Sequence, residues 1–249
     1  MSKGKAMIKR YPERHPVRKG VLCLLAVLLC AAAAPVVFFG IKGGMMYRGA
    51  VSEISLGERI EAVRDEEHFT CFSDLPDFYV SAVISVEDRR FEKHSGIDLI
   101  AIGRAAWADI KAMSWVEGGS TITQQVAKNL LFTQEKRLER KAAECFAAFA
   151  LEAGYSKNEI FELYVNTAYF GSGYHGIYDA AMGYFKKPPS ELSDYEAAML
   201  AGLPNAPSAY SPDTNMELAV KRVSQVLQSM AANEILTREE ADNILSGGQ

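Results

Sequence analysis

Side chains suited to acid–base chemistry are concentrated in residues 87–98, which read Glu-Asp-Arg-Arg-Phe-Glu-Lys-His-Ser-Gly-Ile-Asp. Glu87 is the first carboxylate of this run. The neighbouring charge of Asp88 would raise the pKa of Glu87 towards the range of a useful general base. The same four residues, Glu87 to Arg90, would also suit a solvated charged turn. The segment therefore needs a second feature before it indicates a catalytic site.

That second feature is the segment 118–129, Gly-Gly-Ser-Thr-Ile-Thr-Gln-Gln-Val-Ala-Lys-Asn. The glycine pair permits a tight turn, and Thr121 followed by Gln124 is typical of a capping box at a helix start. Free N–H groups at such a start favour an anion such as phosphate. Ser120 and Gln125 add donors, and Lys128 adds a positive charge about two helical turns further on. An ordinary capped surface helix is the alternative.

A third group of charges lies at Arg140, Lys141 and Glu144. Arg140 and Glu144 are four residues apart and share one helix face, so an exposed ion pair explains them on local grounds. A functional role depends on whether the fold brings them to the first two segments.

The elements that must position these residues are mostly helical. Apolar residues recur at helical spacing over 79–87, 99–115 and 137–152. Capping boxes predict further helix starts at Ser156, Ser193 and Thr237. Strand signals are few, and a short hairpin around residues 51–72 is the main candidate. The sequence therefore predicts a mainly α domain.

An uncharged apolar segment, residues 21–41, precedes this domain. Its length is enough to cross a bilayer core of about 30 Å as a helix. Seven of the 27 Lys and Arg residues lie in the first 20 positions, which predicts a cytoplasmic N-terminus. We therefore predict a basic tail (1–20), a transmembrane helix (21–41), a connector (42–57) and an extracytoplasmic domain (58–249). A cleaved signal peptide, with small residues at 31–34, is the alternative.

Cysteine usage indicates neither a disulfide framework nor a metal site. Cys23 and Cys30 lie in the apolar segment, whereas Cys145 falls on the apolar side of a predicted helix, where a buried thiol is expected. No metal-ligand spacing of Cys or His occurs in the sequence. The net charge of −4 does not by itself indicate or exclude nucleic acid as a partner.

Taken in order, the motifs resemble those of the peptidoglycan transglycosylases, the family 51 glycosyltransferases. The resemblance covers roughly residues 75–212. It comprises the segments 87–98 and 118–129, Arg-Lys-x-x-Glu at 140–144, Glu-x-Tyr-x-Asn at 162–166, Tyr-Phe-Gly at 169–171 and the run at 196–204. Where the family usually reads Tyr-Phe-Gly-Lys, this chain has Lys186 in place of the glycine. The chain ends at Gln249 without room for a transpeptidase domain, so the resemblance is to a monofunctional enzyme.

The resemblance implies a lysozyme-like helical fold behind a single membrane helix. It implies an enzyme of the bacterial cytoplasmic membrane that polymerises lipid II into β-1,4-linked glycan, with inversion and release of undecaprenyl pyrophosphate. The implied partners are lipid II, the growing glycan, the membrane and penicillin-binding or other cell-wall assembly proteins, without nucleic acid. A divalent cation, Mg²⁺ or Mn²⁺, near the pyrophosphate is also compatible with the family.

Residue roles follow from the matched positions. Glu87 matches the family base, and Glu144 the second family glutamate, which we expect to position the cations. Residues expected to bind substrate or to hold the local network are Asp88, Ser120, Thr121, Gln125, Lys128, Asn129, Arg140 and Lys141.

Two other functions remain open at this point. A lysozyme-like hydrolase would also use a single catalytic glutamate, but it would need no cationic surface for pyrophosphate. A non-enzymatic relative could anchor a cell-wall assembly complex, although such a protein would not need an intact Glu87, Lys128 and Glu144.

Overall fold

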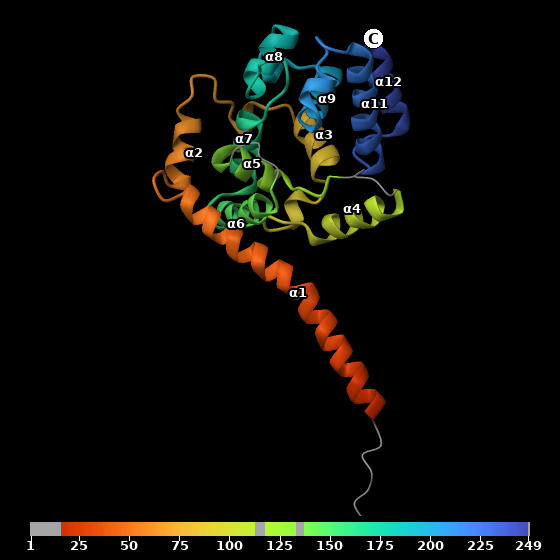
Figure 1. Ribbon diagram of the computed structural model, residues 1–249. Helices are drawn as coiled ribbons and strands as arrows, with labels where there is room; N and C mark the ends of the chain where they lie inside the picture. Colours follow the sequence, from red (N-terminus) through yellow and green to blue (C-terminus); the bar gives the residue numbers. More distant parts are fainter. Residues whose placement is uncertain (1–15, 113–117, 133–136, 249) are drawn as a thin grey trace, which may run out of the picture.

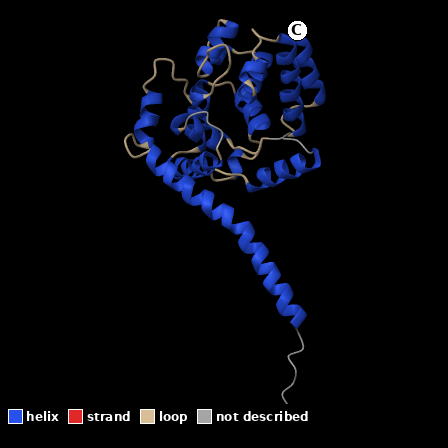
Figure 2. Ribbon diagram, in the orientation of Figure 1, coloured by secondary structure: helices blue, strands red, loops and turns tan. Residues whose placement is uncertain are grey.

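The chain folds into helices joined by short loops. The computed structural model describes residues 16–112, 118–132 and 137–248, and these ranges contain no β-strand (Figure 2). The predicted mainly α fold is therefore confirmed. The α-helices are α1 (Pro16–Ala50), α2 (Leu56–Arg64), α3 (Asp77–Glu87), α4 (Leu99–Ala112), α5 (Ile122–Leu131), α6 (Leu138–Gly154), α7 (Lys157–Thr167), α8 (Ile177–Phe185), α9 (Asp194–Gly202), α10 (Pro207–Tyr210), α11 (Met216–Ala232) and α12 (Arg238–Gly247). Four 3-10 turns are η1 (Phe72–Asp74), η2 (Phe91–Lys93), η3 (Pro189–Glu191) and η4 (Leu203–Asn205).

Helix α1 projects away from the body of the protein (Figure 1). Its part from Gly20 to Ala50 is long and apolar enough to cross a membrane, and the most apolar stretch is exposed. The predicted transmembrane segment 21–41 lies inside this helix. Within the predicted connector, residues 42–57, α1 continues without a break to Ala50.

Capping boxes mark the helix starts as the sequence predicted. In each box the N-cap side chain accepts a hydrogen bond from the backbone N–H three residues further on. The Glu or Gln side chain at that position in turn accepts the backbone N–H of the N-cap residue. The N-cap residues are Thr121, Ser156, Ser193 and Thr237. A further box at Ser55 and Glu58 starts α2. The hairpin expected around residues 51–72 is therefore wrong, because this segment forms α2 and η1. The decisive signal was the capping box followed by Ile60, which is fully buried.

The core joins two groups of helices. Helix α5 packs on α6 and α7, whereas α9 packs on α3 and α11. Large side chains with at most 1 % of their surface exposed fill the space between elements, among them Tyr79, Phe91, Phe161 and Tyr164. The C-terminal end of α3 meets the N-terminal end of α5 in this arrangement. The charged segment 87–98 begins at that junction.

Lys186 occupies the position at which the family usually has glycine. It caps the C-terminal end of α8 with φ of 62° and ψ of 29°, in the left-handed region. A side chain there costs about 1 kcal/mol, because the Cβ atom approaches the following carbonyl oxygen. Lys186→Gly should therefore raise the Tm by about 2–4 °C in thermal unfolding. Lys186→Ala keeps the Cβ atom and should bring no gain. An equal gain from both variants would contradict the backbone explanation.

Candidate active site

Glu87 is the last residue of α3, and its side chain is only 9 % exposed. The Gln125 side-chain amide, on the facing helix α5, donates a hydrogen bond of 2.8 Å to Glu87 Oε2. The other oxygen, Oε1, lies 3.6 Å from Nη2 of Arg222 on α11. Glu87 is thus held between two helices that come from distant parts of the sequence.

The pKa of Glu87 is raised above the ordinary value of a carboxyl group. Burial is the largest cause, because it disfavours the ionised form, and the negative charge of Asp88 adds to it. The Gln125 hydrogen bond and the charges of Arg222 and Lys128 act in the opposite direction. Two fully buried tyrosines, Tyr79 and Tyr164, sense the same low-dielectric environment, and burial raises their pKa as well. A raised carboxyl pKa is what a general base needs near neutral pH.

Asp88 holds the end of α3 against the start of α5. Its buried carboxylate oxygen Oδ2 accepts the backbone N–H of Ile122 at 3.0 Å and lies 2.8 Å from Nε2 of His94. The backbone N–H of Gly96 donates to Nδ1 of the same ring, so the proton on His94 must be on Nε2, facing Asp88. Asp88 therefore acts on the site by fixing Glu87 relative to α5.

Asp88→Ala should destabilise the protein, because it leaves a buried imidazole and a helix-start N–H without their acceptor. Loss of hydrogen bonds to a buried charged group costs about 2–3 kcal/mol, or a fall in Tm of about 4–12 °C. Thermal unfolding of the detergent-solubilised protein measures it. Asp65→Ala, at an exposed carboxylate after α2, is the control and should leave the Tm unchanged. An equal Tm for wild type and Asp88→Ala would show that Asp88 does not support the fold.

Thr121 and Gly96 also serve the framework. Thr121 Oγ1 donates to the carbonyl oxygen of Gly96 at 2.6 Å and accepts the backbone N–H of Gln124 at 3.1 Å. Gly96 has φ of 97°, and a Cβ atom there would lie 3.0 Å from the backbone of Ala148. The segment 87–98 is thereby clamped between α5 and α6.

Positive charges gather on the inner side of α6. Glu144 is almost fully buried, and its two oxygens lie 3.1 Å from Nε of Arg140 and 2.9 Å from Nζ of Lys141. Lys141 also donates a hydrogen bond of 2.6 Å to the hydroxyl of Ser120. The pair predicted from the four-residue spacing forms, but it lies inside the fold rather than on the surface. Glu144 therefore holds two cations in place, one of which, Lys141, reaches Ser120 after the glycine pair.

Lys128 completes this group from helix α5. Within the part of the chain that the structure describes, its ammonium group has no hydrogen-bond or ion-pair partner. Burial lowers its pKa, and the like charges of Arg140 and Lys141 lower it further, whereas Glu144 and Glu87 raise it. A desolvated cation among other cations is a good receptor for an anion.

Two adjoining cavities meet at Glu87. The first has a volume of about 300 Å³ and contains Glu87 and the cations, and its walls include Glu87, Ser120, Gln125, Lys128, Arg140, Lys141 and Glu144. The second, of about 440 Å³, shares Val86, Glu87, Gly118, Ser120 and Asn205 with the first. Asp88 and Thr121 border the second cavity. Asn129 lines neither cavity. Its side-chain amide instead donates a hydrogen bond of 3.5 Å to the Thr167 hydroxyl.

This arrangement agrees with what the sequence shares with known proteins. A model of the family described as transglycosylase matches residues 55–231, which is more than half of the chain and includes every residue of the first cavity. The chain belongs to the transglycosylase family.

Similar curated proteins are much longer than this chain. It is 43 % identical over 178 residues to penicillin-binding protein 1A of Aquifex aeolicus, and the aligned region covers 72 % of this chain and 24 % of that protein. It is 39 % identical over 181 residues to penicillin-binding protein 2D of Bacillus subtilis, covering 73 % and 26 %. The chain thus spans about a quarter of the length of these relatives. A crystal structure of penicillin-binding protein 1A from Haemophilus influenzae is also similar, with 27 % sequence identity and a TM-score of 0.34. The match covers 50 % of this chain and 15 % of the chain in that structure.

Two residues of the candidate site are not indicated by the sequence analysis. Arg222 contacts Glu87 from α11, and its Nε also donates to the carbonyl oxygen of Gly202. Asn205 borders both cavities and directly follows the motif at 196–204, which does not include it. Arg222 lies in an otherwise ordinary amphipathic helix, so only tertiary packing reveals its position.

The described residues do not form a metal-binding cage. No group of three or more His, Cys, Asp or Glu side chains suited to a metal occurs among them. Glu144, the carboxylate nearest the cations in sequence and space, already has both oxygens paired with Arg140 and Lys141. A divalent ion can also be held by one or two carboxylates together with substrate phosphates, without an all-protein cage, so the cation that the family resemblance admits stays a prediction.

Proposed function

We propose that this protein is a peptidoglycan glycosyltransferase that polymerises lipid II. It would join the sugars by β-1,4 bonds with inversion and release undecaprenyl pyrophosphate. The observation that carries the proposal is one cavity with a buried carboxylate of raised pKa, Glu87, opposite the cations Lys128, Arg140 and Lys141. Base and anion receptor are the two groups that glycosyl transfer from a diphosphate requires.

Glu87 acts on the acceptor. As an ionised carboxylate it removes the proton from the 4-hydroxyl of the acceptor sugar, while that oxygen forms a bond to C1 of the donor sugar. The hydrogen bond from Gln125 keeps the carboxylate aimed at the cavity. Attack from the face opposite the diphosphate converts the α-linked donor into a β-linked product, which accounts for the inversion.

The cations act on the leaving group. When the bond between C1 and the diphosphate oxygen breaks, its electron pair leaves with the diphosphate. Preorganised positive charges stabilise that developing charge, and no proton needs to be supplied. Lys128 has no fixed partner in the described chain, whereas Glu144 holds Arg140 and Lys141 in place, so Lys128 can pair fully with the substrate.

The second cavity suits the acceptor molecule. It adjoins the first cavity at Glu87 and is bordered by Arg89, Arg104 and Asn233, and by Arg90, which pairs with Asp98 at 2.8 Å. Such a surface favours an anion, and an acceptor lipid II also carries a diphosphate. Glu87, at the boundary of the two cavities, would then face the acceptor hydroxyl and the donor carbon together.

A membrane location agrees with this substrate, whose lipid tail stays in the bilayer. Helix α1 provides a candidate anchor, and the basic residues before it favour a cytoplasmic N-terminus with the catalytic domain outside. The outer face of α4 adds exposed apolar side chains, with Leu99 at 72 % and Trp107 at 70 %. An amphipathic helix of this kind can lie in the membrane interface.

The test is incubation of the detergent-solubilised protein with labelled lipid II, followed by gel separation of the products. We expect a ladder of glycan that lysozyme digests. Release of soluble fragments from purified cell wall, without a ladder, would instead favour a hydrolase. A folded protein that binds lipid II but forms no ladder would favour the scaffold function.

A further inference from the structure

The contact between α1 and α6 is unusually close at one glycine. A Cβ atom on Gly43 would lie 2.5 Å from Cβ of Ala142, 2.7 Å from its carbonyl carbon and 2.7 Å from the backbone nitrogen of Ala143. Two of these three atoms belong to the α6 backbone. A side chain at Gly43 could therefore be accommodated only if one of the two helices moved.

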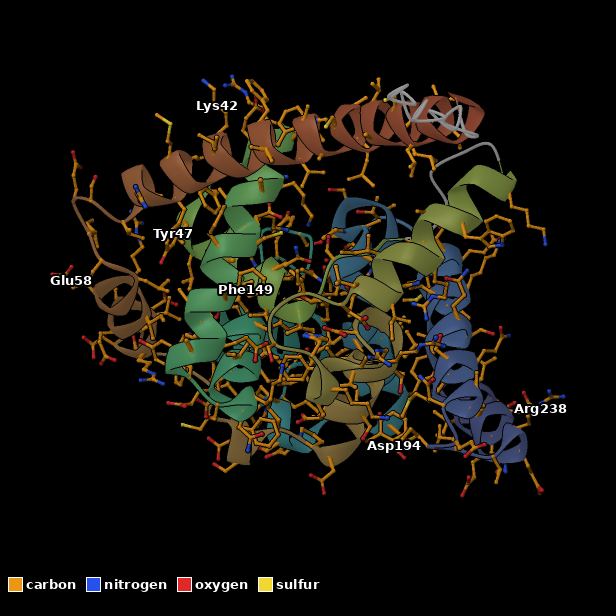
Figure 3. The ribbon with its side chains drawn as sticks, turned by 90° about the horizontal axis from the view of Figure 1, so that it is seen from below. Lys42, Tyr47, Glu58, Phe149, Asp194 and Arg238 are labelled. Atoms are coloured by element: carbon orange, nitrogen blue, oxygen red, sulfur yellow. The ribbon has the colours of Figure 1, made fainter. Side chains whose placement is uncertain are left out.

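The other glycines of α1 do not share this constraint. A Cβ atom on Gly20, Gly40 or Gly49 would meet nothing within 4 Å, and on Gly44 it would make an ordinary contact of 3.6 Å with the Phe146 ring. Among the described helices, α1 and α6 also have the most extensive packing. In Figure 3, α1 lies across one end of α6, with the labelled Lys42 and Tyr47 on the part of α1 that crosses it.

The same stretch of α6 carries the cation group. Ala142 and Ala143, which contact Gly43, lie between Lys141 and Glu144 in the sequence. Helix α6 thus faces α1 with its small residues and the first cavity with Arg140, Lys141 and Glu144. A shift of α6 relative to α1 would move these charges relative to the bilayer that α1 is suited to cross.

We propose that Gly43 is a positioning residue, whose contact with α6 fixes the cation group at a set height and tilt above the membrane. The inference rests on the proposed function, because only a substrate held in the bilayer by its lipid tail presents its diphosphate at a fixed height. Misplacement by about 1 Å can lower a rate about 100-fold. The membrane helix is then part of the binding site's geometry and not only an anchor.

The experiment uses the full chain in lipid nanodiscs, with Gly43→Ala and Gly43→Val as variants and Gly40→Ala and Gly49→Ala as matched controls. Binding of two probes is measured: undecaprenyl pyrophosphate, which is embedded in the bilayer, and geranyl pyrophosphate, which is soluble. We expect Gly43→Val to weaken binding of the embedded probe about 10- to 100-fold, the size of losing one hydrogen bond to a charged group, with a smaller effect for Gly43→Ala. Binding of the soluble probe, and both controls, should stay within about twofold of wild type.

The two probes separate positioning from simple damage. An equal loss for both would mean that Gly43 only keeps α6 intact, and would overturn the proposal, as would unchanged binding of both. If the Gly43→Val protein does not insert into the bilayer, the same comparison of the two probes is made with Gly43→Ala. If wild type bound the embedded probe but formed no glycan ladder, the proposed polymerisation would be wrong. The binding of the two probes would still test the positioning role of Gly43. If wild type bound neither probe, both proposals would be wrong.

Discussion

Glu87→Gln should reduce the polymerisation of lipid II by about 10²–10⁴-fold, because a positioned general base contributes a factor of that size. Glutamine has nearly the same shape, and Gln125 can still donate to its carbonyl oxygen, so the fold of the site should persist. The measurement is the initial rate of glycan formation from labelled lipid II. Binding of lipid II should change much less than the rate, because the variant removes proton acceptance and leaves the cations intact.

The matched control is Glu92→Gln, an exposed glutamate on η2 five positions further along the chain. It removes one negative charge from the same segment without entering either cavity, and should retain the wild-type rate. Full activity of Glu87→Gln would show that another group takes the proton. Equal losses in the two variants would point to the net charge of the segment as the cause.

Glu87→Gln should also be more stable than wild type at neutral pH. Glu87 has a raised pKa in the folded state, so its favourable contribution is complete below the unfolded pKa of about 4.3 and is lost as the pH rises through the folded pKa. Glutamine is uncharged at every pH and avoids this loss. The Tm of Glu87→Gln should therefore exceed that of wild type at pH 7, and the two should converge at pH 4. A lower Tm at pH 7 would contradict the burial of an ionised Glu87.

How far the sequence could predict this protein depends on the range of the interaction concerned. Capping boxes such as Thr121 with Gln124 are local, since the partners are three residues apart, and four of them were located from the sequence. The hairpin expected around residues 51–72 is wrong because the capping box of Ser55 and Glu58 starts α2 there, and this local signal outweighs the weak strand propensity of the segment.

Long-range contacts set the limit for the site. Glu87, Lys128 and Arg140 were selected from the sequence, but that they share one cavity is a property of how α3, α5 and α6 pack. Asp88 and Thr121 were expected to hold substrate or the local network, and the structure directs their side chains to His94, Ile122 and Gly96. Arg222 could not be found at all, because no pattern within α11 distinguishes it from an exposed basic residue.

Lys128→Met should lower kcat/KM for lipid II by about 10²–10³-fold, which is the usual effect of removing one preorganised group that stabilises developing negative charge. Methionine keeps much of the length and apolar character of the side chain, so the helix and the wall of the cavity should remain. Lys93→Met, at an exposed lysine of η2, is the matched control and should stay near wild type. Unchanged kcat/KM in Lys128→Met would remove this lysine from the leaving-group site.

The pH profile gives Lys128 a second, independent test. Activity requires Glu87 ionised and Lys128 protonated, so kcat/KM should be bell-shaped. The raised pKa of Glu87 moves the acid limb to higher pH, and the lowered pKa of Lys128 moves the alkaline limb to lower pH. The pH range of high activity is therefore narrowed from both sides. In Lys128→Met the alkaline limb should disappear. Its acid limb should move to higher pH, because the charge of Lys128 no longer lowers the pKa of Glu87. An alkaline limb that persists unchanged in Lys128→Met would mean that a different group must be protonated for transfer.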